Sequence, residues 1–122
     1  MATALVIDDN RQTANALAQM LEVLGLEVYL AYGASSGIAL LGNLLPDLIL
    51  LDINMPGIDG LEVLAYLRRE PRLNAVPVII ITSDDQPETR QRAFQMGAQG
   101  FILKPVTLDS VEMELKRLEI VS

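Results

Sequence analysis

The sequence predicts an α/β fold, a single doubly wound domain whose parallel five-stranded sheet is covered by helices on both faces. Short apolar runs alternate with helix-period segments along the 122 residues, the pattern of repeated strand–helix units. Residues 48–51 are apolar at four consecutive positions, as expected for a strand buried on both faces of a parallel sheet. Asp52 follows directly, at the carboxyl end of that strand, where open α/β sheets place their binding sites.

Five apolar runs that end in turn-forming or charged residues mark the strands. They cover residues 4–7, 27–31, 48–51, 76–81 and 100–103. In the second run, Val28 and Leu30 share one face because side chains alternate along a strand. The first and third runs end at aspartates, the fourth ends at Thr82, and the fifth ends at Lys104. Four of the five strands therefore end in side chains that carry a charge or a hydroxyl.

Apolar residues at helical spacing follow each of these runs. The expected helices cover residues 11–24, 34–45, 61–70, 87–96 and 108–118. Asn10 is a suitable N-cap for the first helix, and Pro46 stops the second. The third helix ends before Pro71. Pro87 lies in the first turn of the fourth helix, and Gly97 follows its end as a C-terminal cap.

The carboxyl ends of these strands are expected to form one site. Right-handed crossovers between parallel strands bring those ends to the same edge of the sheet. Neighbouring strands lie about 4.8 Å apart, so side chains at their ends can meet. This edge is expected to carry Asp8, Asp9, Asp52, Thr82 and Lys104.

Each of these side chains alone has an ordinary structural role, as a turn former, a helix cap or a satisfied hydroxyl. Their combination does not, because carboxylates about 4 Å apart repel by on the order of 4 kcal/mol per pair at an effective dielectric of about 20. The cluster therefore predicts a bound cation, and a ligand set made only of oxygens favours Mg²⁺. One lysine and one hydroxyl beside that cation predict a phosphoryl group as ligand.

The composition argues against several classes of protein. Half of the residues are apolar, which indicates a folded domain. Cysteine and histidine are absent, so disulfides, thiol chemistry and a phosphohistidine on this chain are ruled out. The net charge of −7 argues against direct nucleic-acid binding, and no apolar run is long enough to span a membrane. Because a strand pattern follows Met1 at once, we expect no signal peptide and a cytoplasmic location.

The chain resembles the receiver domain of two-component response regulators over essentially its whole length, residues 1–122. Four motifs at successive strand ends carry the resemblance: Asp8-Asp9, residues 51–60 (Leu-Asp-Ile-Asn-Met-Pro-Gly-Ile-Asp-Gly), Thr82-Ser83, and residues 101–105 (Phe-Ile-Leu-Lys-Pro). The resemblance implies a flavodoxin-like fold with the strand order 2-1-3-4-5.

The same resemblance implies a phosphoacceptor and a Mg²⁺ site. Asp52 would accept the phosphoryl group. Asp9, Asp52 and the main-chain carbonyl of Asn54 would bind Mg²⁺ directly, and Asp8 would act mostly through water. Asn54, two residues beyond the phosphoacceptor, is also a candidate for tuning the reaction.

Further residues are implied to bind the phosphoryl group or to report its presence. Thr82, Ser83 and Lys104 would contact its oxygens. Thr82 and Phe101 match the switch pair of the family, with phenylalanine standing where tyrosine is also common. The peptide bond between Lys104 and Pro105 is a candidate cis bond.

Asp84 lies two residues beyond Thr82, at the expected mouth of the phosphoryl site. It is a candidate for tuning the reaction, either by orienting the hydrolytic water or by repelling small anionic donors. Capping of the fourth helix by Asp84 and Asp85 is an equally good interpretation, because aspartate is a favoured N-cap residue.

The resemblance implies that Asp52 takes a phosphoryl group from the phosphohistidine of a histidine kinase or phosphotransfer protein. The domain would then hydrolyse its own acyl phosphate, so we expect a switch rather than a turnover enzyme. Its readout would be a docking face for a downstream protein or for an output domain outside this sequence. A weak phosphorylation-dependent dimer is one form that this readout could take.

Three alternatives stay open at this point. A receiver-like docking module that is never phosphorylated would keep the same fold. An aspartyl-phosphate phosphatase would need a second acid where Asn54 stands. A nucleotide-binding module would need a glycine-rich phosphate loop, which none of the strand–helix turns provides. The residues do not distinguish a stand-alone receiver from a part of a larger regulator or hybrid kinase.

Overall fold

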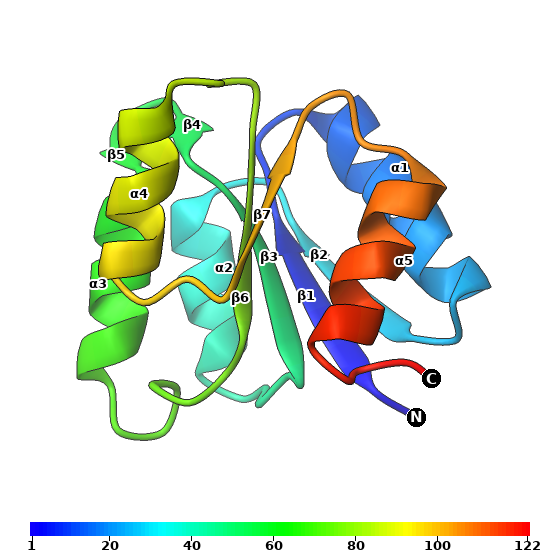
Figure 1. Cartoon of the computed structure of the whole chain (residues 1–122). Coiled ribbons are helices and arrows are strands. Elements are labelled where there is room, and N and C mark those ends of the chain that lie inside the picture. The colour runs from blue at the N-terminus through cyan, green and yellow to red at the C-terminus, as the bar shows by residue number, and fades with distance from the viewer.

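A computed structural model describes all residues, 1–122, and contains a five-stranded parallel sheet with helices on both faces (Figure 1). The sheet strands are β1 (Thr3–Ile7), β2 (Glu27–Ala31), β3 (Leu48–Asp52), β6 (Val78–Thr82) and β7 (Gly100–Leu103). Their spatial order is β2-β1-β3-β6-β7. Counted along these five strands, this is the predicted order 2-1-3-4-5, and the predicted fold class is confirmed.

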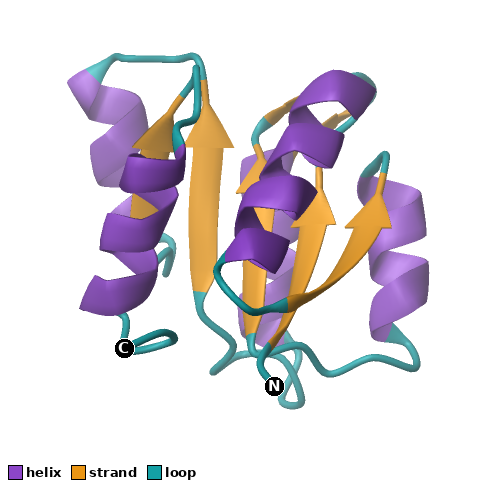
Figure 2. Cartoon of the chain, turned by 90° about the vertical axis from the view of Figure 1, so that its right-hand side faces the viewer, coloured by secondary structure: helices purple, strands orange, loops and turns teal.

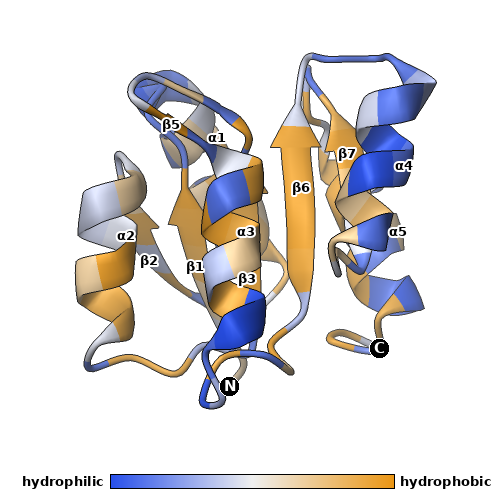
Figure 3. Cartoon of the chain, turned by 90° about the vertical axis from the view of Figure 1, so that its left-hand side faces the viewer, coloured by the Kyte–Doolittle hydropathy of each residue, from blue (hydrophilic) through white to orange (hydrophobic).

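Five helices cover the sheet and form two separate apolar layers with it. They are α1 (Arg11–Val23), α2 (Ala34–Leu41), α3 (Gly60–Arg69), α4 (Pro87–Gln95) and α5 (Leu108–Arg117). Buried side chains of α1 and α5 pack on one face, and those of α2, α3 and α4 pack on the other (Figures 2 and 3). Every residue of β3 and β6 is buried, as expected for central strands covered on both sides.

Helix α4 buries fewer side chains than any of the other helices. Its only buried side chain is that of Ala93, and Figure 3 shows that most of its surface is hydrophilic. The N-cap residue Gln86 makes no side-chain hydrogen bond to the helix. Phe94 packs against Phe101 of β7 with 6.5 Å between the ring centroids, and it stays 37% exposed. This helix therefore covers β6 and β7 through few apolar contacts.

Two predicted boundaries are wrong by a few residues. The second helix ends at Leu41 instead of residue 45. The N–H groups of Gly42 and Asn43 bond to carbonyls three residues earlier, and these tighter turns end the α-helix. The fourth sheet strand begins at Val78 instead of residue 76. Pro77 has no N–H to give to the sheet, and the N–H of Val76 bonds back to the carbonyl of Leu73.

The loop after β3 contains an element that the sequence pattern did not predict. Two short strands, β4 (Asn54–Met55) and β5 (Ile58–Asp59), pair antiparallel around a turn in which Gly57 has a φ of 80°. This small hairpin leads directly into α3, whose N-cap Asp59 accepts a hydrogen bond from the N–H of Leu61. It fixes the chain just beyond Asp52.

None of the helices is both long and apolar enough to cross a bilayer.

Candidate functional site

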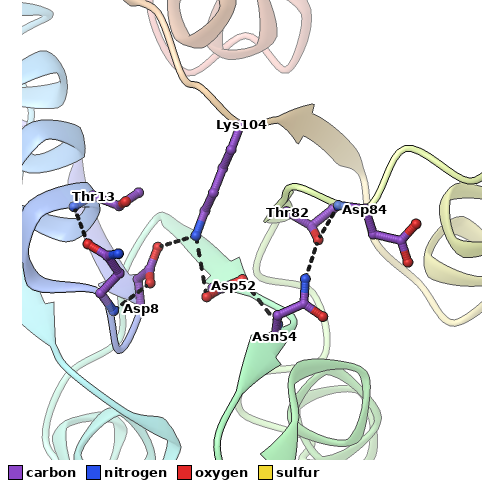
Figure 4. A network of polar contacts seen from close by, with 8 residues as sticks. Asp8, Thr13, Asp52, Asn54, Thr82, Asp84 and Lys104 are labelled. Atoms are coloured by element: carbon purple, nitrogen blue, oxygen red, sulfur yellow. Dashed lines mark hydrogen bonds and ion pairs between the residues drawn. The ribbon is translucent and has the colours of Figure 1, made fainter.

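The polar strand ends meet at one edge of the sheet, as predicted (Figure 4). Asp8 follows β1, Asp52 ends β3, Thr82 ends β6, and Lys104 follows β7. Asp52 is aligned with Ile81 of β6, and Thr82 is aligned with Leu103 of β7. The parallel register therefore places the four side chains side by side along the carboxyl edge.

Two buried carboxylates share one ammonium group in this site. Asp8 is 1% exposed and Asp52 is 2% exposed. Lys104 Nζ lies 3.2 Å from Asp8 Oδ2 and 3.5 Å from Asp52 Oδ2. One ammonium group therefore faces two buried carboxylates, so the site carries an excess of negative charge.

The hydrogen bonds of the two carboxylates are incomplete. Asp8 Oδ1 accepts from the N–H of Asn10 at 2.9 Å, and Asp52 Oδ1 accepts from the N–H of Asn54 at 3.1 Å. Asp8 Oδ2 is buried without a hydrogen-bond partner, because its contact with Lys104 lacks hydrogen-bond geometry. Burial raises the pKa of Asp52 to about 6, and repulsion by Asp8 adds to the rise, whereas the Asn54 N–H and Lys104 oppose it.

The residues present fit a divalent cation. Carboxylate oxygens of Asp8, Asp9 and Asp52 lie within 4.8 Å of one another. Asp9 is exposed, whereas the other two are buried, so the cluster opens to solvent on one side. A buried carboxylate oxygen that accepts no hydrogen bond, within a set of oxygen ligands, is the chemistry that Mg²⁺ binds.

Thr82 is fully buried, and its hydroxyl belongs to a hydrogen-bond network beside the carboxylates. Its Oγ1 accepts from Asn54 Nδ2 at 2.9 Å and from the N–H of Asp84 at 3.1 Å (Figure 4). Ser83, the other predicted hydroxyl, is exposed. The bond between Asn54 and Thr82 was missed by sequence reasoning, because only the fold brings residues 28 positions apart into contact.

Phe101, the second member of the predicted switch pair, is 8% exposed and packs in the apolar layer of α2, α3 and α4. The guanidinium of Arg90 lies 5.6 Å from the centroid of its ring and 5.2 Å from that of Phe94. The ring of Phe101 therefore packs against the apolar core, and the guanidinium of Arg90 lies over it.

Asp84 is engaged with the start of α4. Its carboxylate accepts hydrogen bonds from the Thr89 hydroxyl at 2.7 Å and the N–H of Gln86 at 2.9 Å. Figure 4 shows that this carboxylate is directed away from Asp52. The Thr89 bond, followed by the Gln86 bond, lowers the pKa of Asp84. These contacts are those of a helix cap, and the tuning role stays a prediction.

Two backbone features complete the loops around the site. The peptide bond between Lys104 and Pro105 is cis, as expected. Gly60, at the start of α3, lies against the backbone after β3, and its N–H bonds to the carbonyl of Ile53 at 3.0 Å. A Cβ at position 60 would overlap the carbonyl oxygen of Asp52 and the Cα of Ile53. The glycine therefore permits the close approach that orients the loop.

Comparisons with known proteins agree with this geometry. Residues 4–116 match the response regulator receiver domain family. Protein PilH of Pseudomonas aeruginosa is 36% identical over 106 residues, which cover 87% of this chain and 88% of PilH. The transcriptional regulator RpaA of Synechocystis is 32% identical over 118 residues, which cover 97% of this chain but only 49% of RpaA. The chemotaxis response regulator CheY4 of Vibrio cholerae has a TM-score of 0.90 at 27% identity, covering 97% of this chain and 98% of CheY4.

Proposed function

The chain belongs to the response regulator receiver domain family, and on that premise we propose that Asp52 accepts a phosphoryl group from the phosphohistidine of a partner protein. Receiver domains are signalling modules of two-component systems rather than metabolic enzymes. One observation carries the proposal: the Asp52 carboxylate is buried at the sheet edge with a lysine ammonium 3.5 Å away. The donor would be a histidine kinase or a phosphotransfer protein.

The transfer would form a bond between Asp52 Oδ2 and phosphorus. The bond from phosphorus to the donor's histidine nitrogen breaks, and its electron pair stays on that nitrogen. Because Oδ1 accepts the Asn54 N–H, Oδ2 is the oxygen left to attack. With a pKa of about 6, the carboxyl group is mostly ionised at neutral pH, as a nucleophile must be. Lys104 would then neutralise charge on the phosphoryl oxygens.

The acidic cluster would hold Mg²⁺ during this reaction. The family resemblance assigns direct contacts to Asp9, Asp52 and the main-chain carbonyl of Asn54, with Asp8 acting mostly through water. The spacing of the three carboxylates, and an Asp8 Oδ2 that accepts no hydrogen bond, support this assignment. When bound, the ion supplies positive charge that offsets the carboxylates and the incoming phosphoryl oxygens.

The phosphoryl group would be read through Thr82 and the surface formed by α4, β7 and α5. The Thr82 hydroxyl would donate to a phosphoryl oxygen, which biases the domain toward its signalling arrangement. Phe101 is already buried before any phosphoryl group is added, so its inward movement cannot be the whole signal. The loosely held α4 is the better candidate for the moving part. A downstream protein or an output domain would dock there.

Phosphate incorporation tests the proposal. The wild-type chain and the Asp52→Asn variant would be incubated with Mg²⁺ and either acetyl phosphate or a phosphorylated histidine phosphotransfer protein. We expect the intact mass of the wild type to rise by one phosphoryl group and that of the variant to stay unchanged. Folded wild-type protein that takes up no phosphate from either donor would instead favour a docking module that is never phosphorylated.

A further inference from the structure

The hydroxyl of Thr82 accepts two hydrogen bonds and donates none. A hydroxyl group carries one proton to donate and two lone pairs that accept. Both accepting positions of Thr82 Oγ1 are filled, by Asn54 Nδ2 at 2.9 Å and by the N–H of Asp84 at 3.1 Å. The residue is fully buried, so water does not compete for these positions in the folded chain. The proton is the only bonding capacity that remains.

No protein acceptor takes that proton. The hydroxyl of Thr82 makes no hydrogen bond in which it is the donor. It lies at the same sheet edge as Asp52, whose partner in the register is the residue before Thr82. A phosphoryl group on Asp52 would bring acceptor oxygens to this edge. The free donor and its future acceptor therefore belong to the same site.

Asn54 makes hydrogen bonds to both Asp52 and Thr82. Its backbone N–H donates to Asp52 Oδ1 at 3.1 Å, while its side-chain amide donates to Thr82. The β4–β5 hairpin fixes its backbone by pairing it with Asp59. The second donor to Thr82 is a main-chain N–H, which no side-chain substitution removes. Asn54 is thus the one side chain that makes a hydrogen bond to the hydroxyl of Thr82.

We propose that Asn54 is a positioning residue that acts through Thr82: its amide fills an accepting position of the hydroxyl and so keeps the proton available for a phosphoryl oxygen. The inference rests on the proposed phosphorylation of Asp52 and adds a reason for an amide at position 54. Alanine there would leave the hydroxyl free to rotate. Aspartate there would reverse the polarity, because a carboxylate would accept the proton itself.

A double-mutant cycle with the phosphoryl mimic beryllofluoride tests this proposal. The proteins would be the wild type, Asn54→Ala, Thr82→Val and the double variant, since valine keeps the shape of threonine without its hydroxyl. Binding would be titrated at fixed Mg²⁺ and followed by amide resonances. We expect Asn54→Ala to weaken binding roughly three- to tenfold in the wild-type background, and less than twofold when Thr82 is valine. Asn54→Asp should weaken it further than Asn54→Ala.

A matched control and a metal-free readout separate positioning from other effects. Asn43→Ala removes an exposed amide remote from the strand ends, and it should bind beryllofluoride as the wild type does. Without metal or mimic, the side-chain amide protons of Asn54, although the residue is exposed, should exchange more slowly in the wild type than those of the exposed Asn43. Thr82→Val should remove this protection, because the accepting oxygen is gone.

Three results would overturn the inference. Equal losses from Asn54→Ala in both backgrounds would mean that Asn54 contacts the mimic directly. Wild-type affinity in Asn54→Ala, or unprotected Asn54 amide protons in the wild type, would mean that the hydrogen bond has no orienting role. Wild-type protein that bound no beryllofluoride and took up no phosphate would contradict the proposed function itself. Phosphate uptake by the wild type together with any of the three results would contradict only the role of Asn54.

Discussion

Asp8 and Asp52 are both buried beside Lys104, and this imbalance of charge governs the chemistry of the individual residues. A buried carboxylate without full compensation destabilises the folded chain, and burial raises the pKa of Asp52 for the same reason. If Asp52 is the proposed phosphoacceptor, the carboxylate that this function requires also lowers the stability of the metal-free fold.

Replacement of Asp52 by asparagine should stabilise the metal-free protein. Burial favours the protonated form of Asp52 in the folded state, with a pKa of about 6 against an unfolded value near 3.8. The cost of ionising it is therefore absent below about pH 4, grows between pH 4 and 6, and is complete above pH 6. We expect Asp52→Asn to raise the free energy of unfolding by about 2 kcal/mol at pH 7.5 and to have little effect at pH 3.5.

Urea unfolding at the two pH values in the presence of a chelator measures this difference. A variant that gained as much stability at pH 3.5 as at pH 7.5 would show that the gain does not come from removing an ionised carboxylate.

Replacement of Asp84 by alanine should lower the thermal stability, because two donors at the start of α4 lose their acceptor. Asp85 provides the control, since it is the exposed neighbour without a hydrogen bond to the helix. The tuning prediction adds that Asp84→Ala changes the lifetime of the aspartyl phosphate severalfold. An unchanged lifetime with reduced thermal stability would leave Asp84 only its capping role.

At the scale of the elements, the site depends on how closely the loop after β3 approaches the start of α3. Gly60 allows this approach, because any Cβ there would overlap the backbone of residues 52 and 53. The hairpin β4–β5 then holds Asn54 where its N–H reaches Asp52 and its amide reaches Thr82. The hydrogen bond from the Asn54 N–H to Asp52 thus depends on one glycine and one short hairpin.

Gly60→Ala should therefore destabilise the fold by about 2–4 kcal/mol and displace the loop. Gly33→Ala is the matched control, because nothing lies within 4 Å of a Cβ at position 33. Chemical denaturation measures the first effect, and amide chemical shifts of residues 52–59 measure the second. Equal stability of the two variants would contradict the close approach.

Arg68 is the second residue on which several elements depend. Its guanidinium, at the end of α3, donates to the loop that precedes β6 and to the turn between α4 and β7. The acceptors are the carbonyls of Leu73, Asn74, Val76 and Gly97 and the side chain of Gln99. We expect Arg68→Met to lower the free energy of unfolding by about 2–4 kcal/mol, whereas Arg69→Met, at an exposed neighbour, should change it by less than about 0.5 kcal/mol. Similar losses of unfolding free energy in both variants would show that the hydrogen bonds of Arg68 do not stabilise the fold.

The contrast between predicted and observed elements has a physical basis. Helix placement and the convergence of Asp8, Asp52 and Lys104 follow from local patterns and the handedness of crossovers, whereas the strand order came from the resemblance to receiver domains. The hairpin of residues 54–59, the contacts of Arg68 and the bond from Asn54 to Thr82 depend on distances that only tertiary packing sets. The predicted end of the second helix and the predicted start of the fourth sheet strand were wrong, because local backbone hydrogen bonds near a glycine and a proline set these boundaries.

For the whole molecule, the net charge of −7 and the acidic cluster predict that divalent cations raise the stability of the fold. An ion that binds only the folded state adds RT ln(1 + [L]/Kd), which is about 1.4 kcal/mol at ten times Kd. Mg²⁺ should therefore raise the melting temperature of the wild type. Asp9→Ala should lose most of this increase, whereas Glu22→Ala, which removes one exposed charge outside the cluster, should keep it. Identical melts with and without Mg²⁺ would contradict the metal site.

The location of the phosphoryl group decides whether Asp52 is a Mg²⁺-dependent phosphoacceptor. Protein treated with a phosphodonor in Mg²⁺ or in a chelator would be reduced with borohydride, which converts an aspartyl phosphate to homoserine, and then digested for peptide mass spectrometry. We predict homoserine at position 52 alone, in the Mg²⁺ sample alone. Modification at another aspartate, or equal modification of Asp52 in the chelator, would contradict the account of a Mg²⁺-dependent phosphoacceptor at the end of β3.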